Sequence, residues 1–530
     1  MELQPQHRRR AACSAVTVPE GSSAGRLAPD SAERAAIHCS RDSKVRGTPP
    51  LLRTGLACGC GEFSWITEHH TERSRHMNSR LLALVAAIAL FLAGCAGLFP
   101  WSQREDFIRV RGGRFLFNGK PYYFAGTNLW YGCYLGSPGE TGDRDRLRKE
   151  LDSLCANGME NLRILAASEQ SYLIRSIRPA IQRAPGNLDD SLLEGLDYLL
   201  AEMGKRHMHA VLFLNNYWQW SGGMAQYNVW ADGMAGAADP DDTTQGYQKF
   251  MVFSGTFYHN EKANALFRDF VRTIVYRRNT MNGRKYCDDP TIMAWQLANE
   301  PRPGTSGPDG EENLDAFYSW IDQTAAYIHM LDTNHLVSTG SEGAVGFRWS
   351  TDYALRTHQS KYIDYITFHI WPKNWSWFEP YHFEQTLGPS KEKALAYMAS
   401  HLAVARRLNK PLVLEEFGMA RDSAKCAPES PTTARDRYFR TLLGALEDSA
   451  RAGAPIAGSN FWGWGGLARG RNADDVWRKG DPFLGDPPQE PQGYNSVFVT
   501  DTSTVRILRE HAEHLKAISE SEAPLTAERP

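Results

Sequence analysis

Short apolar runs alternate with longer amphipathic stretches from about residue 107 almost to the end of the chain. The amphipathic stretches repeat their apolar positions with the helical period, most clearly over 146–158, 192–207 and 262–279. No linker or low-complexity segment interrupts the alternation, which predicts an α/β domain with parallel strands. The candidate strands are residues 122–128, 161–166, 209–216, 292–299, 336–340, 365–371, 411–417 and 456–462.

Eight strands alternating with helices predict a (β/α)8 TIM barrel, with a doubly wound open sheet as the structural alternative. The position of the polar residues favours the barrel, because they cluster at the carboxyl ends of the candidate strands. In a barrel these ends meet at one mouth, where the active site is built. We therefore predict a single catalytic domain over residues 107–520 and a tail over 521–530. The polar and aromatic residues at the strand ends are Asn128, Arg163, Asn215, Asn216, Asn299, Glu300, His369, Glu416 and Trp462.

The segment before the barrel has a different character. Residues 1–76 show no helical or strand periodicity, and we interpret them as a non-native upstream extension or as disorder, with Met77 as the true start. Residues 77–95 have the order of a signal peptide, one basic residue followed by an apolar stretch too short to span a bilayer comfortably. Residues 96–106 are expected to be a short tether.

The end of that signal, Leu92-Ala93-Gly94-Cys95, resembles a bacterial lipobox, in which the cysteine is lipidated and becomes the new N-terminus. The resemblance implies a lipid anchor on Cys95 as the one membrane contact. The residue that follows, Ala96, resembles an outer-membrane address. The chain is thus expected in the cell envelope as an outer-membrane lipoprotein, or secreted if the segment is a plain signal peptide.

Composition narrows the range of partners. A formal net charge of −2 provides no field for nucleic acid, and we expect none as a partner. The chain holds 15 Trp and 21 Tyr, whose flat rings suit the apolar faces of sugars, although many of them are needed to fill the core. Four cysteines follow Cys95, and one disulfide among them is possible without the sequence specifying which: Cys133, Cys155, Cys287 and Cys426. A monomer is expected.

Two motifs place acidic residues at strand ends. Glu300 follows the fourth strand in Asn-Glu-Pro, beside Asn299, whose amide can bind a sugar hydroxyl, and Glu415 and Glu416 end the seventh strand. Cleavage of a glycosidic bond requires one acid to protonate the departing oxygen and one carboxylate to attack the sugar. Adjacent strand residues point to opposite sides, so only one of Glu415 and Glu416 is expected to face the barrel axis.

Together these motifs resemble glycoside hydrolase family 5, most closely its β-1,4-mannanases, over residues 107–515. The resemblance rests on FAGTNLWYG (124–132), NNYWQWSGGMAQY (215–227), DDPTIMAWQLANEPR (288–302), TGSEG (339–343), FHIWPKNW (368–375) and LEEFG (414–418). It implies that Glu300 is the acid/base and Glu416 the nucleophile of a retaining enzyme that needs no metal and no cofactor. The implied substrate is β-mannan.

The same resemblance assigns further roles. Arg163 should contact the nucleophile carboxylate, His369 should line the subsite at the cut bond, and Trp462 should lie beneath the sugar there. Many family members have Tyr where this chain has Trp371, whose indole N–H either preserves the hydrogen bond to the nucleophile or packs as a wall, and we favour the first. Trp130 and Trp218 are candidate substrate platforms, with core packing as the alternative for each.

Charge should separate the two catalytic acids. We expect Arg163 to lower the pKa of Glu416, and the charge of Glu416 to raise the pKa of Glu300. Two alternatives to a mannanase stay open at this point. One is a β-1,4-glucanase of the same family, and the other is a non-catalytic glycan-binding surface lipoprotein.

Overall fold

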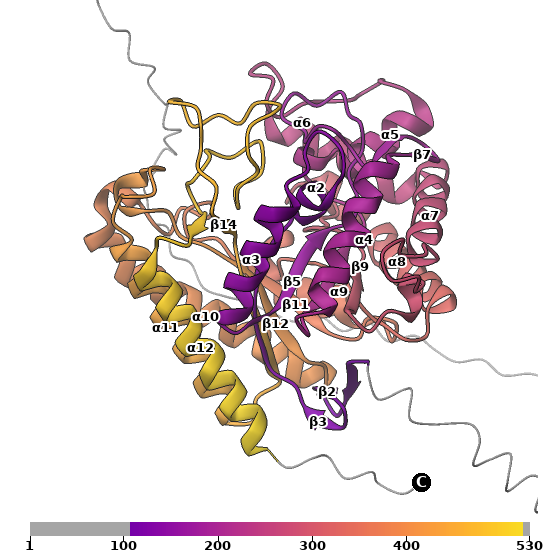
Figure 1. The fold of residues 1–530 in the computed structure, drawn as a ribbon. Helices are drawn as coiled ribbons and strands as arrows, with labels where there is room; N and C mark the ends of the chain where they lie inside the picture. The colour runs from indigo at the N-terminus through magenta and orange to yellow at the C-terminus, as the bar shows by residue number, and fades with distance from the viewer. Residues whose placement is uncertain (1–106, 523–530) are drawn as a thin grey trace, which may run out of the picture. The chain divides into compact units, whose positions relative to one another are not determined.

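The computed structural model describes residues 107–522 and shows a closed parallel barrel (Figure 1). Eight strands pair in the order β10-β9-β8-β5-β4-β13-β12-β11, and a parallel bridge between Ser338 and Tyr365 joins the two end strands. Closure rules out the doubly wound open sheet and confirms the eight predicted strands. These are β4 (Phe124–Asn128), β5 (Met159–Leu165), β8 (His209–Phe213), β9 (Ile292–Gln296), β10 (Leu336–Ser338), β11 (Ile366–Ile370), β12 (Leu412–Phe417) and β13 (Ile456–Phe461).

Helices surround the barrel, and several begin at a side-chain cap. Asp143, Asp189 and Asn260 each accept a hydrogen bond from the backbone N–H three residues later, which satisfies a donor of the first turn. The helices of the described chain are α2 (Gly132–Gly136), α3 (Arg144–Ala156), α4 (Asp190–Gly204), α5 (Gly223–Asp232), α6 (Gly246–Gly255), α7 (Glu261–Val275), α8 (Pro308–Leu331), α9 (Thr351–His358), α10 (Phe383–Leu408), α11 (Thr433–Arg451) and α12 (Thr502–Ser521). None of them is long and apolar enough to cross a membrane.

The two ends of the barrel are covered differently. A small antiparallel sheet, β1 (Arg109–Arg111), β2 (Arg114–Phe117) and β3 (Lys120–Pro121), lies at the lower end in Figure 1. From it, Phe115 packs against Phe124 and Tyr365, with ring centroids 6.2 and 5.3 Å apart, which fills the amino ends of the strands. The upper end carries the long loops, including 467–496 with β14 (Trp464–Gly466) and β15 (Val497–Phe498) on either side.

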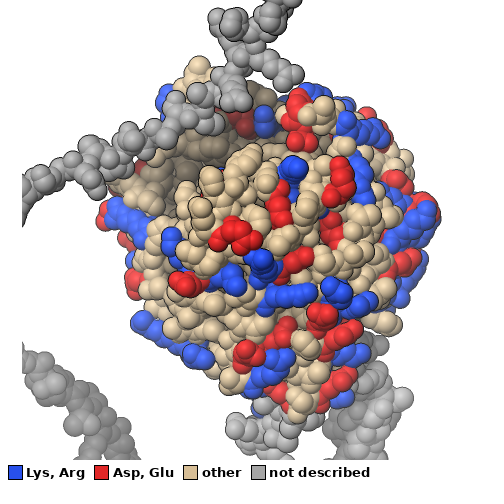
Figure 2. Space-filling view, turned by 90° about the vertical axis from the view of Figure 1, so that its left-hand side faces the viewer, with Lys and Arg blue, Asp and Glu red and all other residues tan. Residues whose placement is uncertain are grey.

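The structure bears on the expectation about the cysteines but not on those about the segments before residue 107. All four cysteines of the described chain are free thiols: Cys133, Cys155, Cys287 and Cys426. The interpretations of residues 1–76, 77–95 with Cys95, and 96–106 lie outside the described residues. Basic and acidic side chains are interspersed over the face in Figure 2, whose hollow near the upper edge is mostly uncharged.

Candidate active site

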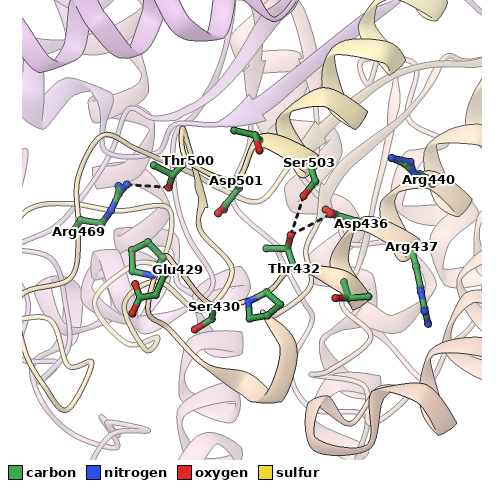
Figure 3. A pocket seen from close by; sticks show the side chains of 14 residues that line it. Glu429, Ser430, Thr432, Asp436, Arg437, Arg440, Arg469, Thr500, Asp501 and Ser503 are labelled. Carbon is green, nitrogen blue, oxygen red and sulfur yellow. Dashed lines mark hydrogen bonds between the residues drawn. The ribbon is translucent and has the colours of Figure 1, made fainter.

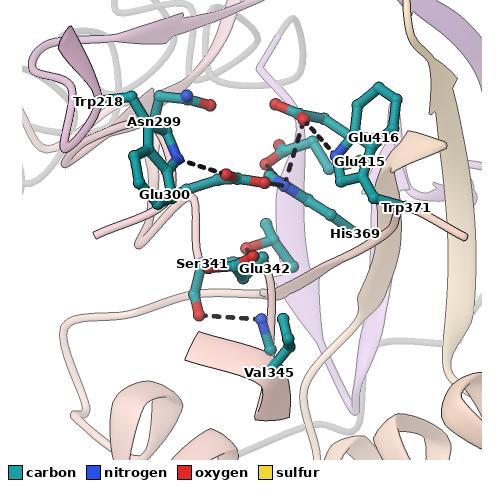
Figure 4. A network of polar contacts seen from close by, with 12 residues as sticks. Trp218, Asn299, Glu300, Ser341, Glu342, Val345, His369, Trp371, Glu415 and Glu416 are labelled. Atoms are coloured by element: carbon teal, nitrogen blue, oxygen red, sulfur yellow. Dashed lines mark hydrogen bonds and ion pairs between the residues drawn. The ribbon is translucent and has the colours of Figure 1, made fainter. Parts of the chain in front are cut away.

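Glu300 lies just beyond β9 in an unusual backbone conformation. Its φ is 47°, in the left-handed region that a side chain other than Gly rarely adopts, and its N–H donates to Gly340 O at 2.9 Å. One carboxylate oxygen lies 2.6 Å from His369 Nδ1 and the other accepts the indole N–H of Trp218 at 2.6 Å (Figure 4). Strained backbone of this kind is typical of functional sites, and here two partners hold the carboxylate in place.

Glu416, near the end of β12, faces Glu300 across the mouth of the barrel. Arg163 Nη1 donates to its Oε1 at 2.5 Å, and Trp371 Nε1 donates to its Oε2 at 3.1 Å. The indole therefore makes the hydrogen bond that the sequence interpretation favoured. His369 Nδ1 is 3.4 Å from Glu416 Oε2, so one imidazole lies between the two acids (Figure 4).

Glu415 also points into the barrel, and the expectation that only one of the two adjacent glutamates would do so is wrong. Gln296 Nε2 lies 2.8 Å from each oxygen of Glu415, and Arg163 Nε lies 3.4 Å from it. The cause is a register shift between β11 and β12: Phe368 pairs with Leu414 but His369 pairs with Glu416. The extra residue is a β-bulge, which breaks the alternation of sides at this point.

Arg163 organises the floor of the site. It is fully buried, and besides Glu416 it donates to Gln296 Oε1 at 2.7 Å, Asn128 Oδ1 at 3.1 Å and Asn299 Oδ1 at 2.8 Å. Asn299 in turn donates to Asn216 Oδ1 at 3.1 Å. A buried guanidinium with four hydrogen-bond partners is held rigidly, so Glu416 and Asn299 are also held in position.

The two acids are close enough for direct attack on a sugar. One oxygen each of Glu300 and Glu416 and one ring nitrogen of His369 lie within 4.8 Å of one another. Carboxyl groups about 5 Å apart suit a retaining glycosidase, whereas an inverting one needs more space for a water molecule. The same three residue types could in principle ligate a cation, but Arg163 already supplies a positive charge against Glu416.

Burial and a shared histidine set the pKa values of the pair. Burial raises the pKa of Glu416 to about 7, with His369 and Arg163 opposing the rise and the charges of Glu300 and Glu415 adding to it. Burial also raises the pKa of Glu300, but the hydrogen bond and charge of His369 outweigh it, so that the net shift is downward. Burial lowers the pKa of His369, yet Glu416 and Glu300 bring it to about 10.

The order of the two pKa values is the reverse of the expected one. The expectation considered Arg163 and the two acids but not a protonated imidazole 2.6 Å from Glu300. The pKa of His369 is raised and that of Glu300 is lowered, so in this arrangement a proton between them is favoured on the imidazole.

The aromatic residues predicted to bind substrate divide into two groups. Trp218 lies at the site, half-buried, and Trp462 directly follows β13, with its ring 6.0 Å from that of Trp371. Trp130 does not belong there, because it is fully buried and its N–H donates to Gly485 O at 3.0 Å. Its ring packs edge-on against Trp220 and Phe483, so the core-packing alternative is correct for Trp130.

Two residues near the acids, Arg302 and Glu490, were missed by the sequence argument. Arg302 forms an ion pair with Glu342, with Nη2 2.7 Å from Oε2, and its guanidinium lies 4.9 Å from the ring centre of Trp218. Its position two residues after Glu300 could have indicated that it lies near the site. Glu490 comes from the 467–496 loop, where burial and then the charges of Asp486, Glu416 and Glu300 raise its pKa well above the usual value. No sequence pattern marks Glu490.

A separate pocket of about 890 Å³ lies away from the two acids (Figure 3). It is lined by the starts of α11 and α12, and its polar groups largely pair with one another. Thr432 Oγ1 contacts Asp436 at 3.2 Å and Ser503 at 3.4 Å, and Arg469 donates to Thr500 at 3.1 Å. Because the two paired acids lie at the barrel mouth, the candidate active site is assigned there and not to this pocket.

Comparison with known proteins points in the same direction. The family model described as "GH family 5 beta-mannosidase-like" matches residues 105–520. A putative mannan endo-1,4-β-mannosidase 9 from Oryza sativa is 30% identical, over 72% of this chain and 86% of the relative. Mannan endo-1,4-β-mannosidase 7 from Arabidopsis thaliana is 28% identical, over 72% and 84%.

Solved structures agree on the architecture. A glycoside hydrolase family 5 mannosidase from Rhizomucor miehei is 35% identical, with a TM-score of 0.72 over 79% of this chain and all of that one. A mutant of such an enzyme was solved in complex with mannosyl-fructose, at 34% identity and a TM-score of 0.71. The endo-1,4-β-mannanase of the same fungus, at 22% identity and a TM-score of 0.56, supports the (β/α)8 barrel alone.

Proposed function

The chain belongs to the β-mannosidase-like group of glycoside hydrolase family 5, and from this premise we propose that it hydrolyses β-1,4-mannosidic linkages in mannan and glucomannan with net retention. One observation carries the proposal: oxygens of Glu300 and Glu416 lie within 4.8 Å, with Arg163 and Trp371 both donating to Glu416. Glu416, held and oriented, is suited to attack, and Glu300, shared with His369, is suited to exchange a proton.

The reaction proceeds in two displacements. Glu416 Oε attacks the anomeric carbon while Glu300 gives a proton to the departing glycosidic oxygen, so that a glycosyl ester forms on Glu416 and the leaving chain departs as an alcohol. Glu300, now ionised, takes a proton from water, whose oxygen attacks the same carbon and releases Glu416. Two inversions give net retention, and no other reactant is required.

The proton for the first step is available at the His369–Glu300 contact. Their 2.6 Å separation lets the proton shared by this pair move from the imidazole to the carboxylate. The negative charge of Glu416 stabilises the imidazolium of His369. Esterification of Glu416 removes this charge, so the imidazolium is best stabilised while Glu416 is ionised. The acid/base cycle therefore involves Glu300 and His369 as a pair.

Substrate class follows from the relatives and from the polar groups beside the acids. The curated relatives are named mannan endo-1,4-β-mannosidases, whereas the solved relative at 35% identity is titled a mannosidase. Mannose differs from glucose in the axial 2-hydroxyl, and Asn299, fixed by Arg163 and Asn216, lies beside the acid/base where that hydroxyl is expected. With the wrong epimer this buried amide would have no hydrogen-bond partner, and the free-energy cost would strongly disfavour that sugar.

Hydrolysis of purified oligosaccharides tests the proposal. We expect kcat/KM on mannohexaose to exceed that on cellohexaose by about 100-fold or more, equivalent to ~3 kcal/mol in transition-state binding. Internal cleavage should give a ladder of products from β-mannan and an early fall in viscosity. Release of mannose alone would show that the enzyme cleaves terminal and not internal linkages. Preference for cellohexaose would identify it as a glucanase. Absence of any hydrolysis would favour a glycan-binding protein.

For localisation we propose that Cys95 carries a lipid anchor, on the strength of the Leu92-Ala93-Gly94-Cys95 motif. The protein expressed from Met77 is expected in the detergent phase after phase separation, because a diacylated N-terminus holds a soluble domain at the membrane. A Cys95→Ser variant behind a cleavable signal should move to the aqueous phase. Equal partitioning of the two proteins would contradict lipidation.

A further inference from the structure

Three tryptophans form an exposed cluster on the loops that follow β10 and β11. Trp349 comes from the first loop, and Trp375 and Trp377 come from the second. The ring of Trp349 lies 5.1 Å from that of Trp375 and 5.4 Å from that of Trp377, and the latter two are 4.9 Å apart. We propose that this cluster, the Trp349 platform, binds sugar residues of the polysaccharide on the leaving-group side of the cut.

Exposure of Trp349 is unusual within the described chain. Its side chain is 47% exposed, and no other tryptophan of residues 107–522 is as exposed. Trp375 and Trp377 are half-buried beneath and beside it. An indole exposed to water lacks the free energy that burial of its apolar surface would contribute. Such exposure is expected where a bound ligand covers the ring.

The backbone at Trp349 adopts a left-handed conformation that residues other than Gly disfavour. Arg348 and Trp349 have φ of 53° and 56°, and two consecutive left-handed residues other than Gly are costly. Arg348 fixes the turn, because it donates through Nε to Ser306 O at 2.9 Å and through Nη2 to Glu311 at 2.8 Å. The loop after β9 therefore holds Trp349 in position from outside the cluster.

The platform is also tied to the active site. Trp375 N donates to Trp371 O at 3.0 Å, and Trp371 in turn contacts Glu416, so one tight turn carries both. Tyr397 lies under the cluster, 5.1 Å from the ring of Trp375, and its hydroxyl donates to Glu342 O at 2.8 Å. Movement of the cluster relative to the catalytic acids is thereby restricted.

Its place around the barrel indicates which part of the substrate it meets. The loops after β10 and β11 lie on the arc between β9, which precedes Glu300, and β12, which carries Glu416. Trp462, expected beneath the attacked sugar, directly follows β13 on the other arc. A chain that rests one residue on Trp462 and extends past Glu300 leads toward the platform.

The chemistry of the surface fits a neutral pyranose chain. Within residues 107–522, none of the three indole N–H groups donates a hydrogen bond, so each is free to bind a hydroxyl while the ring faces cover C–H surfaces. This inference rests on the proposed function for the direction of the chain, and it adds a binding site outside the catalytic residues.

Two substrates separate the platform from the rest of the site. Mannohexaose places sugars on both sides of the cut, whereas 4-nitrophenyl β-mannobioside places only nitrophenol on the leaving-group side. We expect Trp349→Ala to lower kcat/KM about tenfold on mannohexaose and less than about twofold on the aryl substrate. Trp349→Tyr should recover most of the loss, because it restores an aromatic face.

The control is Tyr276→Ala, which removes an aromatic side chain of similar exposure, 45%, at the far end of α7. It should change neither rate. Equal loss on both substrates, or no loss on mannohexaose, would overturn the platform while the proposed function stands. If the wild-type enzyme does not cleave mannohexaose, the proposed function is wrong. Binding by the platform is then tested separately, by retardation in a native gel that contains β-mannan. The platform predicts that Trp349→Ala migrates faster than wild type in this gel, and equal migration would overturn it.

Discussion

Glu416→Ala should lower turnover on every β-mannoside by a factor of about 10⁴ or more, since it removes the carboxylate proposed to form the glycosyl ester. Both donors that now hold Glu416, Arg163 and Trp371, would remain in place, so the loss is chemical and the fold is expected to persist. Initial rates on β-mannan and on an aryl β-mannoside, together with an unchanged circular dichroism spectrum, provide the measurement.

Glu300→Ala should fail differently. The acid matters in proportion to the need of the leaving group for a proton, so this variant should lose most of its activity on mannohexaose but retain part of it on 2,4-dinitrophenyl β-mannoside. Added azide should raise the rate by attacking the ester directly. Equal loss on both substrates would reject Glu300 as the acid/base.

The pH profile distinguishes the two roles further. Attack requires ionised Glu416, whose pKa is raised to about 7, so kcat/KM should increase as the pH rises through about 7. The charge of Glu415 is one of the causes that raise this pKa, so Glu415→Gln should move the acidic limb to lower pH while activity is retained. An inactive Glu415→Gln enzyme with an active Glu416→Gln counterpart would exchange the two assignments.

The barrel itself was predictable from the sequence because its signal is local and repeated. Each strand is a short buried run bounded by polar or turn residues. Each predicted run contains the observed strand, as for β9 (Ile292–Gln296) within 292–299, except that β5 begins two residues before its predicted run. The carboxyl ends of parallel strands must meet, so the gathering of Arg163, Asn299, Glu300, His369 and Glu416 followed from their positions alone.

The features that were not predicted depend on contacts between distant strands. The register of β11 against β12 shifts by one residue, and the resulting bulge turns Glu415 inward, which no pattern within 411–417 reveals. Trp130 lies just after a strand, as the other candidate site residues do, yet packing against Phe483 and Gly485 buries it. Only tertiary structure distinguishes such a residue from Trp218.

The order of pKa values illustrates the same limit at the level of charge. Arg163 does lower the pKa of Glu416, as expected, but burial raises it more. The decisive neighbour of Glu300 is His369, from a strand two positions further around the barrel, at 2.6 Å. Which charge lies nearest a buried acid cannot be read from spacing along the chain.

Arg163→Ala should reduce both stability and activity, because this guanidinium hydrogen-bonds four side chains and forms an ion pair with a fifth, Glu415. Its removal leaves Glu416 and Glu415 buried without their cationic neighbour and deprives Asn128, Gln296 and Asn299 of a donor. Loss of one partner from a buried charged network typically lowers the free energy of unfolding by about 3–5 kcal/mol. Activity at a temperature where the variant is folded should fall by about 10³-fold, since the orientation of Glu416 is lost as well.

The matched control is Arg421→Ala. Arg421 is equally buried and pairs with Asp501 at 2.6 Å, but it contacts neither catalytic acid. Denaturant unfolding should show a comparable loss of stability for both variants, whereas only Arg163→Ala should lose kcat/KM per folded molecule. The pH profile adds a second criterion: Arg163 is one of the charges that lower the pKa of Glu416, so its removal should move the acidic limb of the remaining activity above about 7. An acidic limb that stays in place in Arg163→Ala would show that Arg163 acts on the fold and not on the nucleophile.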